Sequence, residues 1–445
     1  MTTRKVGKHR SAMGRREFLR LSGAGIAGSA LLSACSGFGG EEEDSGGSGT
    51  VTMSHGPDPV LEKLLKKQLE DFNAQHKGEI EAIFRPMGED YFDQLRTQFQ
   101  AGGGDIDVIS GDVIWPAQFG ANGWIDDLSD RFTEEMQGAY LEGPLGANQY
   151  QDAIYGVPWF TDLGMLYYRA DLLKQSGFSN APATYDELFS MAEKVQGEAG
   201  VRHGHVFQGS NYEGGVCNGL EYIWAHGGDA LDPEDPNQVI IDSPESAAGL
   251  ETYRGTVEAG ITPEAIVTFT EPESDAAFRN GDAVFMRNWP YVYGMLLAGD
   301  AEIKLNQVGV APLPAGEGES EGFSTLGGWN LFINATSDVK DEAWELIKFL
   351  TTPEAVKFRA IEGSYLSALQ ETYEDQEVLD AVPVYEVAGQ ITDQIRPRPV
   401  SPFYGDMTLE MAEEFNNCLK GETSPEDAVA TLQESMQGII DQGTS

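Results

Sequence analysis

Cysteine and histidine are scarce in this chain of 445 residues, and their spacing excludes several kinds of site. The cysteines are Cys35, Cys217 and Cys418, and the six histidines are scattered along the sequence. His203 and His205 offer two ligands at most, and no Cys/His cluster has the spacing of a metal site. The sequence therefore predicts no metal and no other cofactor. Cys217 and Cys418 could pair, but isolated cysteines in apolar surroundings are more often buried free thiols, which we expect here.

Basic residues are few, with 29 Lys and Arg against 72 Asp and Glu and a net charge of −43. Residues 1–34 carry seven of the basic residues and one acid, so the chain without them has a charge of −49. Self-repulsion at this density weakens a compact fold in dilute buffer, whereas molar salt shortens the Debye length to about 3 Å and screens it. We therefore expect a halophilic, haloarchaeal source, with an ordinary acidic extracellular protein as the alternative. Nucleic acid is excluded as a partner because its phosphates would be repelled.

Long apolar runs are absent near the N-terminus, where residues 21–32 form only a short, weakly apolar stretch rich in Gly and Ala. A transmembrane helix needs about 20 apolar residues. Basic residues and the paired Arg15 and Arg16, followed by Phe-Leu, precede the stretch and resemble a twin-arginine export signal. The stretch ends in Leu-Ser-Ala-Cys35, which resembles a lipoprotein box in which Cys35 becomes the first mature residue and carries lipid. The alternative is an ordinarily cleaved signal with a chance cysteine.

The sequence divides into a leader, a tether and a globular part. Residues 1–35 are the expected signal with its lipobox, and residues 36–49 form an acidic Gly/Ser tether without apolar periodicity. The roughly 400 residues that follow exceed one typical core and suggest two domains.

Alternating strand and helix patterns from residue 50 onward predict a parallel α/β layer. Strands are expected at 50–54, 79–85 and 105–110, with a helix opened by the Asp58 cap and Pro59 and a second at about 90–100. Helix-start signals recur at Thr184, Ser243, Thr352 and Ser424. Further strands are expected at 154–157, 164–168, 206–208, 283–287, 308–311 and 326–333.

Six short segments place aromatic residues or arginine beside Gly, Pro or polar residues at strand ends and loops. They are residues 111–115 (Gly-Asp-Val-Ile-Trp), 158–162 (Pro-Trp-Phe-Thr-Asp), 208–214 (Gln-Gly-Ser-Asn-Tyr-Glu-Gly), 287–291 (Arg-Asn-Trp-Pro-Tyr), 326–330 (Leu-Gly-Gly-Trp-Asn) and 396–399 (Arg-Pro-Arg-Pro). Sugars present C–H faces that stack on aromatic rings and hydroxyls that need fixed donors and acceptors. The alternative is that these aromatics are core residues, as we expect for Trp124 and Trp344.

These segments carry a resemblance to a known family. The segments occur in the same order as in the extracellular solute-binding proteins of carbohydrate ABC importers, which the sequence resembles over nearly its whole mature length. Within that family it is most similar to the trehalose/maltose-binding branch. The most specific pieces are residues 111–119 and 123–124, 158–164, 166–173, 208–217, 287–291, 308–314, 326–329 and 397–399.

The resemblance implies a two-lobed α/β fold of the type II periplasmic-binding-protein kind, with a ligand cleft between lobes joined by crossing segments. Residues 50–158 and 306–362 would form the first lobe, and residues 159–305 and 363–445 the second. Positions that match disaccharide contacts in the branch are Asp112, Asp162, Trp289, Tyr291, Gly327, Gly328, Trp329 and Arg398. From the same clusters we add Trp115, Gln208, Tyr212 and Glu213, and also Asp58, the acid nearest to the first strand. Phe160 stands where the branch can present a tyrosine, which keeps the stacking but removes a donor.

The implied function is that of a monomeric lipoprotein that binds a sugar outside the cell and delivers it to a membrane permease with a cytoplasmic ATPase. A disaccharide or small oligosaccharide is expected, and no enzymatic activity. The chain has no GxxxxGK[ST] phosphate loop, so it is not the ATPase itself.

Two other classes stay open at this point. Asp112 and Asp162 could face each other across a cleft as the acid and base of a glycoside hydrolase or lyase, although no Ser/His/Asp or Cys/His set accompanies them. A different solute, such as glycerol phosphate, a polyamine or a peptide, is the other alternative. A phosphate would need more cationic groups than Arg398 and Arg287. A surface adhesion role is the weakest interpretation.

Overall fold

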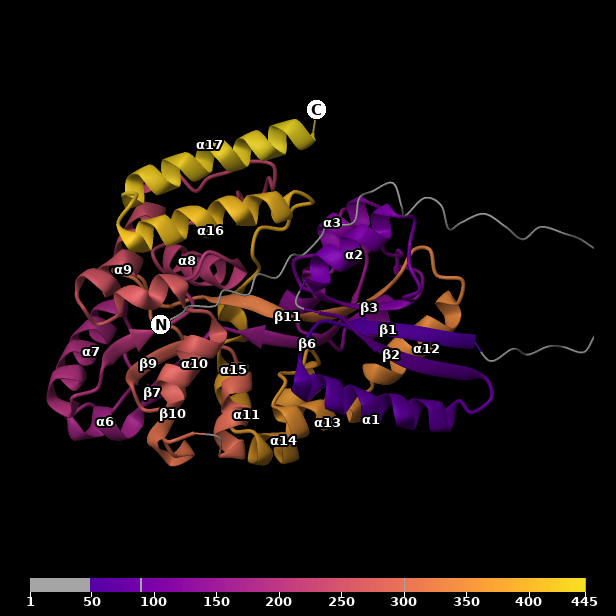
Figure 1. The fold of residues 1–445 in the computed structure, drawn as a ribbon, viewed down its shortest axis with the longest axis horizontal. Coiled ribbons are helices and arrows are strands. Elements are labelled where there is room, and N and C mark those ends of the chain that lie inside the picture. The colour runs from indigo at the N-terminus through magenta and orange to yellow at the C-terminus, as the bar shows by residue number, and fades with distance from the viewer. Residues whose placement is uncertain (1–48, 89, 300, 445) are drawn as a thin grey trace, which may run out of the picture. The chain divides into compact units, whose positions relative to one another are not determined.

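The computed structural model describes residues 49–88, 90–299 and 301–444, which form two α/β lobes with separate sheets (Figure 1). The expected signal and lipidation residues Arg15, Arg16 and Cys35 lie outside these described residues. In the described ranges, no helix combines the length and the apolar content needed to cross a bilayer.

The sheet of the first lobe has the order β12-β11-β3-β1-β2, with β6 also paired to β11. Strands β1, β2 and β3 are parallel, whereas β11 runs antiparallel to both β3 and β6. The bounds are β1 (Gly49–His55), β2 (Ile80–Pro86), β3 (Val108–Asp112), β6 (Val157–Leu163), β11 (Ser324–Ile333) and β12 (Ile395–Arg396). The predicted strand–helix alternation is confirmed in this lobe.

Helices α1 (Pro59–Gln75), α12 and α13 pack against this sheet through apolar stripes. The Asp58 side chain accepts from the backbone N–H groups of residues 60 and 61 and caps α1, as predicted. Trp344 is buried in the same core, and Trp124 stacks on Phe99 at 5.2 Å. The other helices of this lobe are α2 (Tyr91–Gln100), α3 (Pro116–Ala121), α12 (Lys340–Leu350) and α13 (Pro353–Gly363). Short elements are α4 (Glu134–Gln137), α5 (Glu142–Gly146), β4 (Gln149–Tyr150) and β5 (Ala153–Ile154).

The sheet of the second lobe has the order β10-β7-β9-β8. Its strands are β7 (Met165–Arg169), β8 (His203–Val206), β9 (Ala283–Asn288) and β10 (Val308–Ala311). Three strands depart from the predicted lobe boundaries. Strand β10 pairs with β7 in the second sheet, whereas residues 159–163 of β6 and the short β12 pair with β11 in the first. The apolar pattern of a strand predicts that it is buried, but it does not say which sheet it joins.

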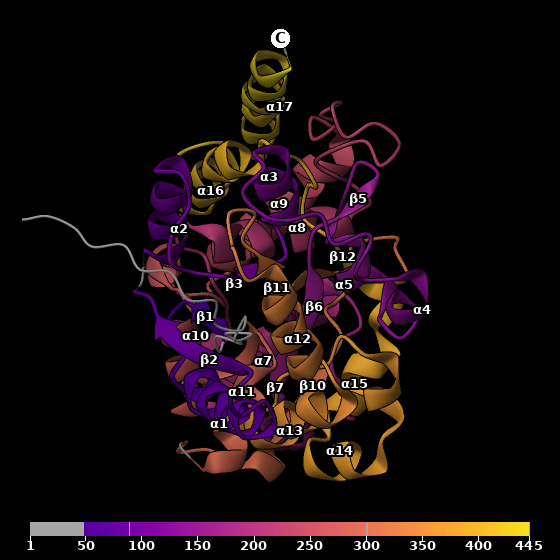
Figure 2. The same cartoon turned by 90° about the vertical axis from the view of Figure 1, so that its right-hand side faces the viewer.

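Long helices cover the second sheet, and α16 and α17 lie together over α8 and α9 (Figures 1 and 2). The Thr184, Ser243 and Ser424 hydroxyls accept from backbone N–H groups at the helix starts, and Thr352 does the same in the first lobe, which confirms these caps. Both Cys217 and Cys418 are buried free thiols, as expected. The helices are α6 (Ala170–Gln175), α7 (Tyr185–Ala199), α8 (Glu213–Ala225), α9 (Pro244–Glu258), α10 (Glu271–Arg279), α11 (Tyr291–Ala298), α14 (Gln376–Ala381), α15 (Val384–Gln390), α16 (Tyr404–Lys420) and α17 (Pro425–Gly443).

A buried ion pair lies where the chain crosses between the sheets. Arg287 on β9 donates from Nε to Glu221 on α8 at 2.8 Å, and the two side chains are 3 % and 2 % exposed. The same carboxylate accepts from the backbone N–H of Thr325, at the start of β11. Gly164 separates β6 from β7, and a Cβ there would lie 2.4 Å from the Glu221 carboxylate. The pair therefore fixes both crossings, and the crossing between β6 and β7 needs glycine.

Replacing Glu221 with Gln keeps the side-chain volume but leaves the Arg287 charge buried without its partner. We expect the free energy of unfolding to fall by about 3 kcal/mol, because the Arg287 charge would stay buried with neither a counter-charge nor water to stabilise it. Denaturant titration in molar KCl measures the loss. The matched control is Glu62→Gln, which removes the exposed pair with Lys66 on α1 and should change stability by less than about 0.5 kcal/mol. Equal effects of the two substitutions would contradict this role.

Candidate functional site

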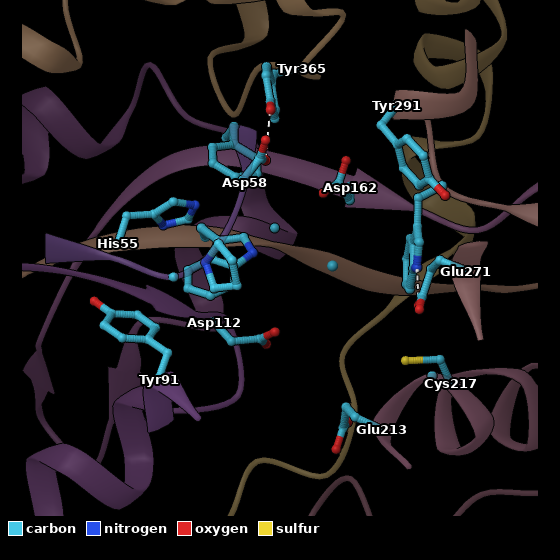
Figure 3. A pocket seen from close by; sticks show the side chains of 18 of the residues that line it. His55, Asp58, Tyr91, Asp112, Asp162, Glu213, Cys217, Glu271, Tyr291 and Tyr365 are labelled. Atoms are coloured by element: carbon cyan, nitrogen blue, oxygen red, sulfur yellow. Dashed lines mark hydrogen bonds between the residues drawn. The ribbon is translucent and has the colours of Figure 1, made fainter. Parts of the chain in front are cut away.

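A cavity of about 570 Å³ opens between the two lobes, and Figure 3 shows it from close by. The first lobe contributes the residues after β1 and β3 and the start of α2, while the second contributes the starts of α8, α10 and α11. Strand β11 passes between them with its Gly-Gly pair. The lining residues are His55, Gly56, Pro57, Asp58, Tyr91, Phe92, Asp112, Trp115, Phe160, Asp162, Tyr212, Glu213, Gly214, Cys217, Glu271, Trp289, Tyr291, Gly327, Gly328, Trp329, Ser364, Tyr365 and Arg398.

Thirteen of the fourteen residues predicted to bind a ligand line this cavity, and Gln208 does not. Gln208 is fully buried inside the second lobe, where its amide N–H donates to Ser274 Oγ at 2.7 Å. Its carbonyl oxygen accepts from Arg287 and from Asn218. The prediction for Gln208 is therefore corrected: its side chain turns inward and supports Arg287, because the residue precedes the turn that carries the cluster's other members.

One aromatic wall of the cavity is built around Trp329 on β11. His55 meets this ring edge-on at 4.7 Å between centroids, and Trp115 does so at 5.6 Å. Tyr91 stacks on it at 6.2 Å with an interplanar angle of 22°. His55 is itself held by a 2.7 Å hydrogen bond between Nδ1 and Ser110 Oγ. These contacts fix the orientation of the half-buried Trp329, which leaves part of it for a ligand.

The opposite aromatic wall is Trp289, which follows β9. The Arg287 guanidinium stacks 4.0 Å from the centroid of its ring, and the indole N–H donates to Glu271 at 3.3 Å. The Tyr212 hydroxyl donates to the other oxygen of Glu271 at 2.7 Å. The Tyr167 hydroxyl donates to the Trp289 carbonyl at 2.9 Å. The buried ion pair of the crossing thus extends, through Arg287, to the position of this ring.

Glycine is required where β11 passes the cavity. Gly327 pairs with Asp162 on β6, and a Cβ on it would lie 3.0 Å from both Asp162 Cβ and the Trp289 ring. Gly328 has φ 114°, and a Cβ on it would lie 2.4 Å from the Phe160 carbonyl oxygen. Larger residues would fill the space between the two aromatic walls and strain the strand.

Arg398 connects acidic groups of both lobes at the edge of the cavity. Its Nη1 donates to Glu213 at 2.5 Å, and its Nη2 donates to Asp112 at 3.1 Å and to the Leu326 carbonyl at 3.3 Å. Glu213 begins α8 of the second lobe, whereas Asp112 ends β3 of the first. The hydroxyls of Tyr404 and Thr408 also donate to Glu213, so this carboxylate is held by α16 as well. The guanidinium is therefore shared between the lobes.

The remaining ionisable groups of the cavity differ in whether they have a hydrogen-bond partner among the described residues. Asp58 accepts from the Tyr365 hydroxyl at 2.7 Å with the oxygen that does not cap α1. Asp162 has no hydrogen-bond partner among the described residues. Burial raises the pKa of Asp162 to about 8, with help from the nearby carboxylates of Asp58 and Asp112 and against the opposing effect of Arg287. Burial also lowers the pKa of His55 to about 4, so at pH 7 Asp162 is mostly protonated and His55 is neutral.

Sequence reasoning missed several lining residues. His55 and Glu271 stand beside predicted elements without any aromatic–polar cluster, and Tyr91 lies within the helix predicted at about 90–100. Tyr365 follows α13, more than 300 residues after the Asp58 that it contacts. For Tyr91, its place near the start of the helix predicted at about 90–100 was the available signal. For Tyr365, only the folded chain brings it to the cavity.

The state of Asp162 predicts a pH dependence of stability. An unfolded carboxyl group ionises near pH 4, so between pH 4 and pH 8 the folded protein holds a proton that the unfolded chain has lost, and this group destabilises the fold increasingly as pH rises. Asp162→Asn removes the effect, so its melting temperature relative to the wild type should rise from pH 5 to pH 8. Thermal unfolding in molar KCl tests this. The control is Asp105→Asn at a side chain that is 98 % exposed, and the same trend in both variants would refute the assignment.

Comparisons with known proteins agree with this architecture. Residues 57–357 match the family described as bacterial extracellular solute-binding protein. The "Probable ABC transporter-binding protein" of Deinococcus radiodurans is 34% identical over 361 residues, covering 78% of this chain and 83% of that protein. The maltotriose-binding protein of Pyrococcus abyssi is 25% identical over 369 residues, covering 82% and 76%.

Solved structures give the same result. Maltose-bound MalE3 of T. maritima has a TM-score of 0.81 and 37% identity, covering 88% of this chain and 100% of that one. The GacH receptor of Streptomyces glaucescens, with a TM-score of 0.79 and 22% identity over 88% of this chain and 99% of that one, shares the fold. The chain belongs to the bacterial extracellular solute-binding protein family, whose members serve ABC transporters, and it has their two-lobed fold.

Proposed function

We propose that this protein captures a disaccharide or small oligosaccharide in the cleft and delivers it to the permease of an importer driven by a cytoplasmic ATPase. The observation that carries the proposal is the pairing of Trp329 and Trp289, held by different lobes, on opposite walls of one 570 Å³ cavity. Cavities of this size suit small ligands, and two indoles in one cavity suit the C–H faces of sugar rings. The relatives named for maltotriose and maltose add support from similar chains.

The polar groups of the cavity supply what sugar hydroxyls need. Carboxylates of Asp58, Asp112 and Glu271 accept, and the fork of Arg398 donates. Each is already oriented by a protein partner, so little ordering is needed when a ligand binds. Phe160, which meets Tyr365 edge-on at 5.0 Å, adds apolar surface at the position where a tyrosine hydroxyl was the alternative. A ligand would present carbon rather than oxygen there.

Lobe closure is the proposed mechanism. A sugar that touches Trp329 and Trp289 together stabilises the closed form, because only that form offers both contacts. The closed, monomeric protein is the form that the permease would recognise. In this structure Arg398 already joins the lobes through Asp112 and Glu213.

Export and anchoring complete the proposal. Residues 1–35 would direct a folded protein through the twin-arginine route, and the lipid on Cys35 would hold it at the outer face of the membrane through the tether 36–49. Without residues 1–34 the charge is −49, which suits a halophilic cell surface.

A binding panel tests the proposed ligand class. Calorimetry in molar KCl with maltose, maltotriose, trehalose, cellobiose, glycerol phosphate, spermidine and a tripeptide should show binding by at least one sugar. Trp289→Ala should weaken that binding by about 2 kcal/mol, because it removes one stacking wall and the partner of Glu271. Trp344→Phe, in the core of the first lobe, is the matched control and should leave the affinity within about twofold.

Other outcomes of the same panel would assign another class. Binding of a non-sugar alone would reject the sugar proposal, and turnover of a sugar would support an enzyme that uses Asp112 and Asp162. Small-angle scattering of the saturated protein should show a smaller radius of gyration. An unchanged radius would reject closure.

The anchor is tested by Cys35→Ser in a halophilic host. Without the thiol there is no lipid, so we expect the protein to move from the membrane fraction to the medium. Cys418→Ser, which changes a buried thiol, should stay in the membrane fraction. Retention of the Cys35 variant in the membrane fraction would rule out lipidation at this residue.

A further inference from the structure

The cavity holds many more acidic than basic groups. Its carboxylates are Asp58, Asp112, Asp162, Glu213 and Glu271, whereas the lining residues that the structure describes include one arginine, Arg398, and no lysine. Arg398 is already occupied by Glu213 and Asp112. Arg287, behind the Trp289 ring, is paired with Glu221. Among the described residues that line the cavity or lie directly behind it, no unpaired Lys or Arg is therefore left to offset the remaining carboxyl groups.

The excess of carboxyl groups over cations affects Asp162 more than the other four carboxyl groups. It lacks a hydrogen-bond partner in the described ranges, whereas the other four carboxylates each accept from the protein. The charged groups that face it are Asp58 from the start of α1, Asp112 from the end of β3 and Arg287 from β9. In the view of Figure 3, Asp162 lies between Asp58 and Tyr291. It pairs with Gly327, where the Trp289 ring is also close, so a ligand group can meet carboxyl and ring together.

Aromatic faces and unpaired carboxylates attract the same kind of group. A cation over the face of an indole or phenol ring is stabilised by the ring's charge distribution, and more strongly where water is excluded. Neutral sugars use carboxylates as acceptors but leave their charge unbalanced. Uronic acids and sugar phosphates would add further negative charge in a low-dielectric cavity.

We propose that the cavity selects sugars that carry a basic nitrogen, with the ammonium group against Asp162 and the neutral rings between Trp289 and Trp329. The inference rests on the proposed sugar-binding function of the same cavity and narrows its substrate class to amino sugars. Sugars with acidic groups are excluded by the same carboxylates.

Binding of an ammonium has a definite proton balance. In the free protein at pH 6.5, Asp162 holds a proton because its pKa is raised to about 8. An ammonium beside the carboxyl stabilises the ionised form, so the carboxyl proton leaves to solvent while the amine keeps its own. One proton is therefore released for each amino sugar bound. A neutral sugar leaves the proton on Asp162, where the hydroxyl can donate.

The experiment compares sugars that differ only by an amine in place of a hydroxyl. The pairs are trehalosamine with trehalose, the glucosamine disaccharide of chitosan with cellobiose, and 2-amino-2-deoxymaltose with maltose, all titrated calorimetrically at pH 6.5 and a fixed molar KCl concentration. In at least one pair the amine should bind roughly tenfold tighter, which corresponds to the difference between a charge-assisted and a neutral hydrogen bond. Titration in two buffers of different ionisation enthalpy should show release of close to one proton.

Asp162→Asn supplies the second arm. It keeps the side-chain volume and removes the ionisable group, so the amine preference should fall to about twofold and the proton release should vanish. If this variant does not fold, the proton count of the wild type still decides. Equal affinities within every pair, binding of the hydroxyl sugars alone, or no proton release overturn the inference and leave the sugar proposal intact. Binding by no sugar of either kind rejects both.

Discussion

The buried pair of Arg287 and Glu221 is the interaction on which the rest of the structure depends. The Glu221 carboxylate accepts a hydrogen bond from the backbone N–H of Thr325, where the chain enters β11. It also lies against Gly164, which separates β6 from β7. The Arg287 guanidinium stacks on the Trp289 ring. A buried ion pair contributes little net stability over apolar packing, but losing one partner is costly. In this protein the role of the pair is therefore to position other elements. Its contacts align two lobe crossings and one wall of the cavity.

The cavity combines groups that are held rigidly with one that is not. Trp329, Trp289 and Arg398 each have several partners, so their geometry is set before a ligand arrives. Asp162 is ionisable and lies in the cavity, but its carboxyl group has no hydrogen-bond partner among the described residues. Preorganised walls reduce the entropy lost on binding, whereas an unsatisfied group gives the ligand something to neutralise. The preorganised residues thus contribute mainly to affinity, whereas Asp162 contributes mainly to selectivity.

Sequence reasoning predicted local structure well where local physics decides it. The Asp58 cap, the four later helix starts and most of the apolar strands were readable because capping and periodicity act over a few residues. The strand expected at 206–208 shares only Val206 with β8. The strand predicted at 105–110 begins three residues later, as β3, and the Asp107 carboxylate just before it accepts from the backbone N–H of Thr52.

What the sequence did not reveal depends on distant partners. The sheet to which β10 belongs is set by pairing with β7, some 140 residues earlier, and the inward turn of Gln208 is set by Ser274 and Arg287. Tyr365 reaches the cavity only because Asp58 lies across from it. Thirteen predicted residues nevertheless gathered in one cavity, because the resemblance supplied the long-range information that propensity lacks.

The packing of α16 and α17 on α8 and α9 has a consequence for the order of events during synthesis. Met407, Met411, Phe415, Leu432 and Met436 belong to the main core of the second lobe, so that core is incomplete until the last 40 or so residues have left the ribosome. Folding of the second lobe must then wait for these C-terminal helices. A translocation route that accepts finished proteins, as the paired arginines of the leader predict, would spare this chain from folding a second time outside the cell.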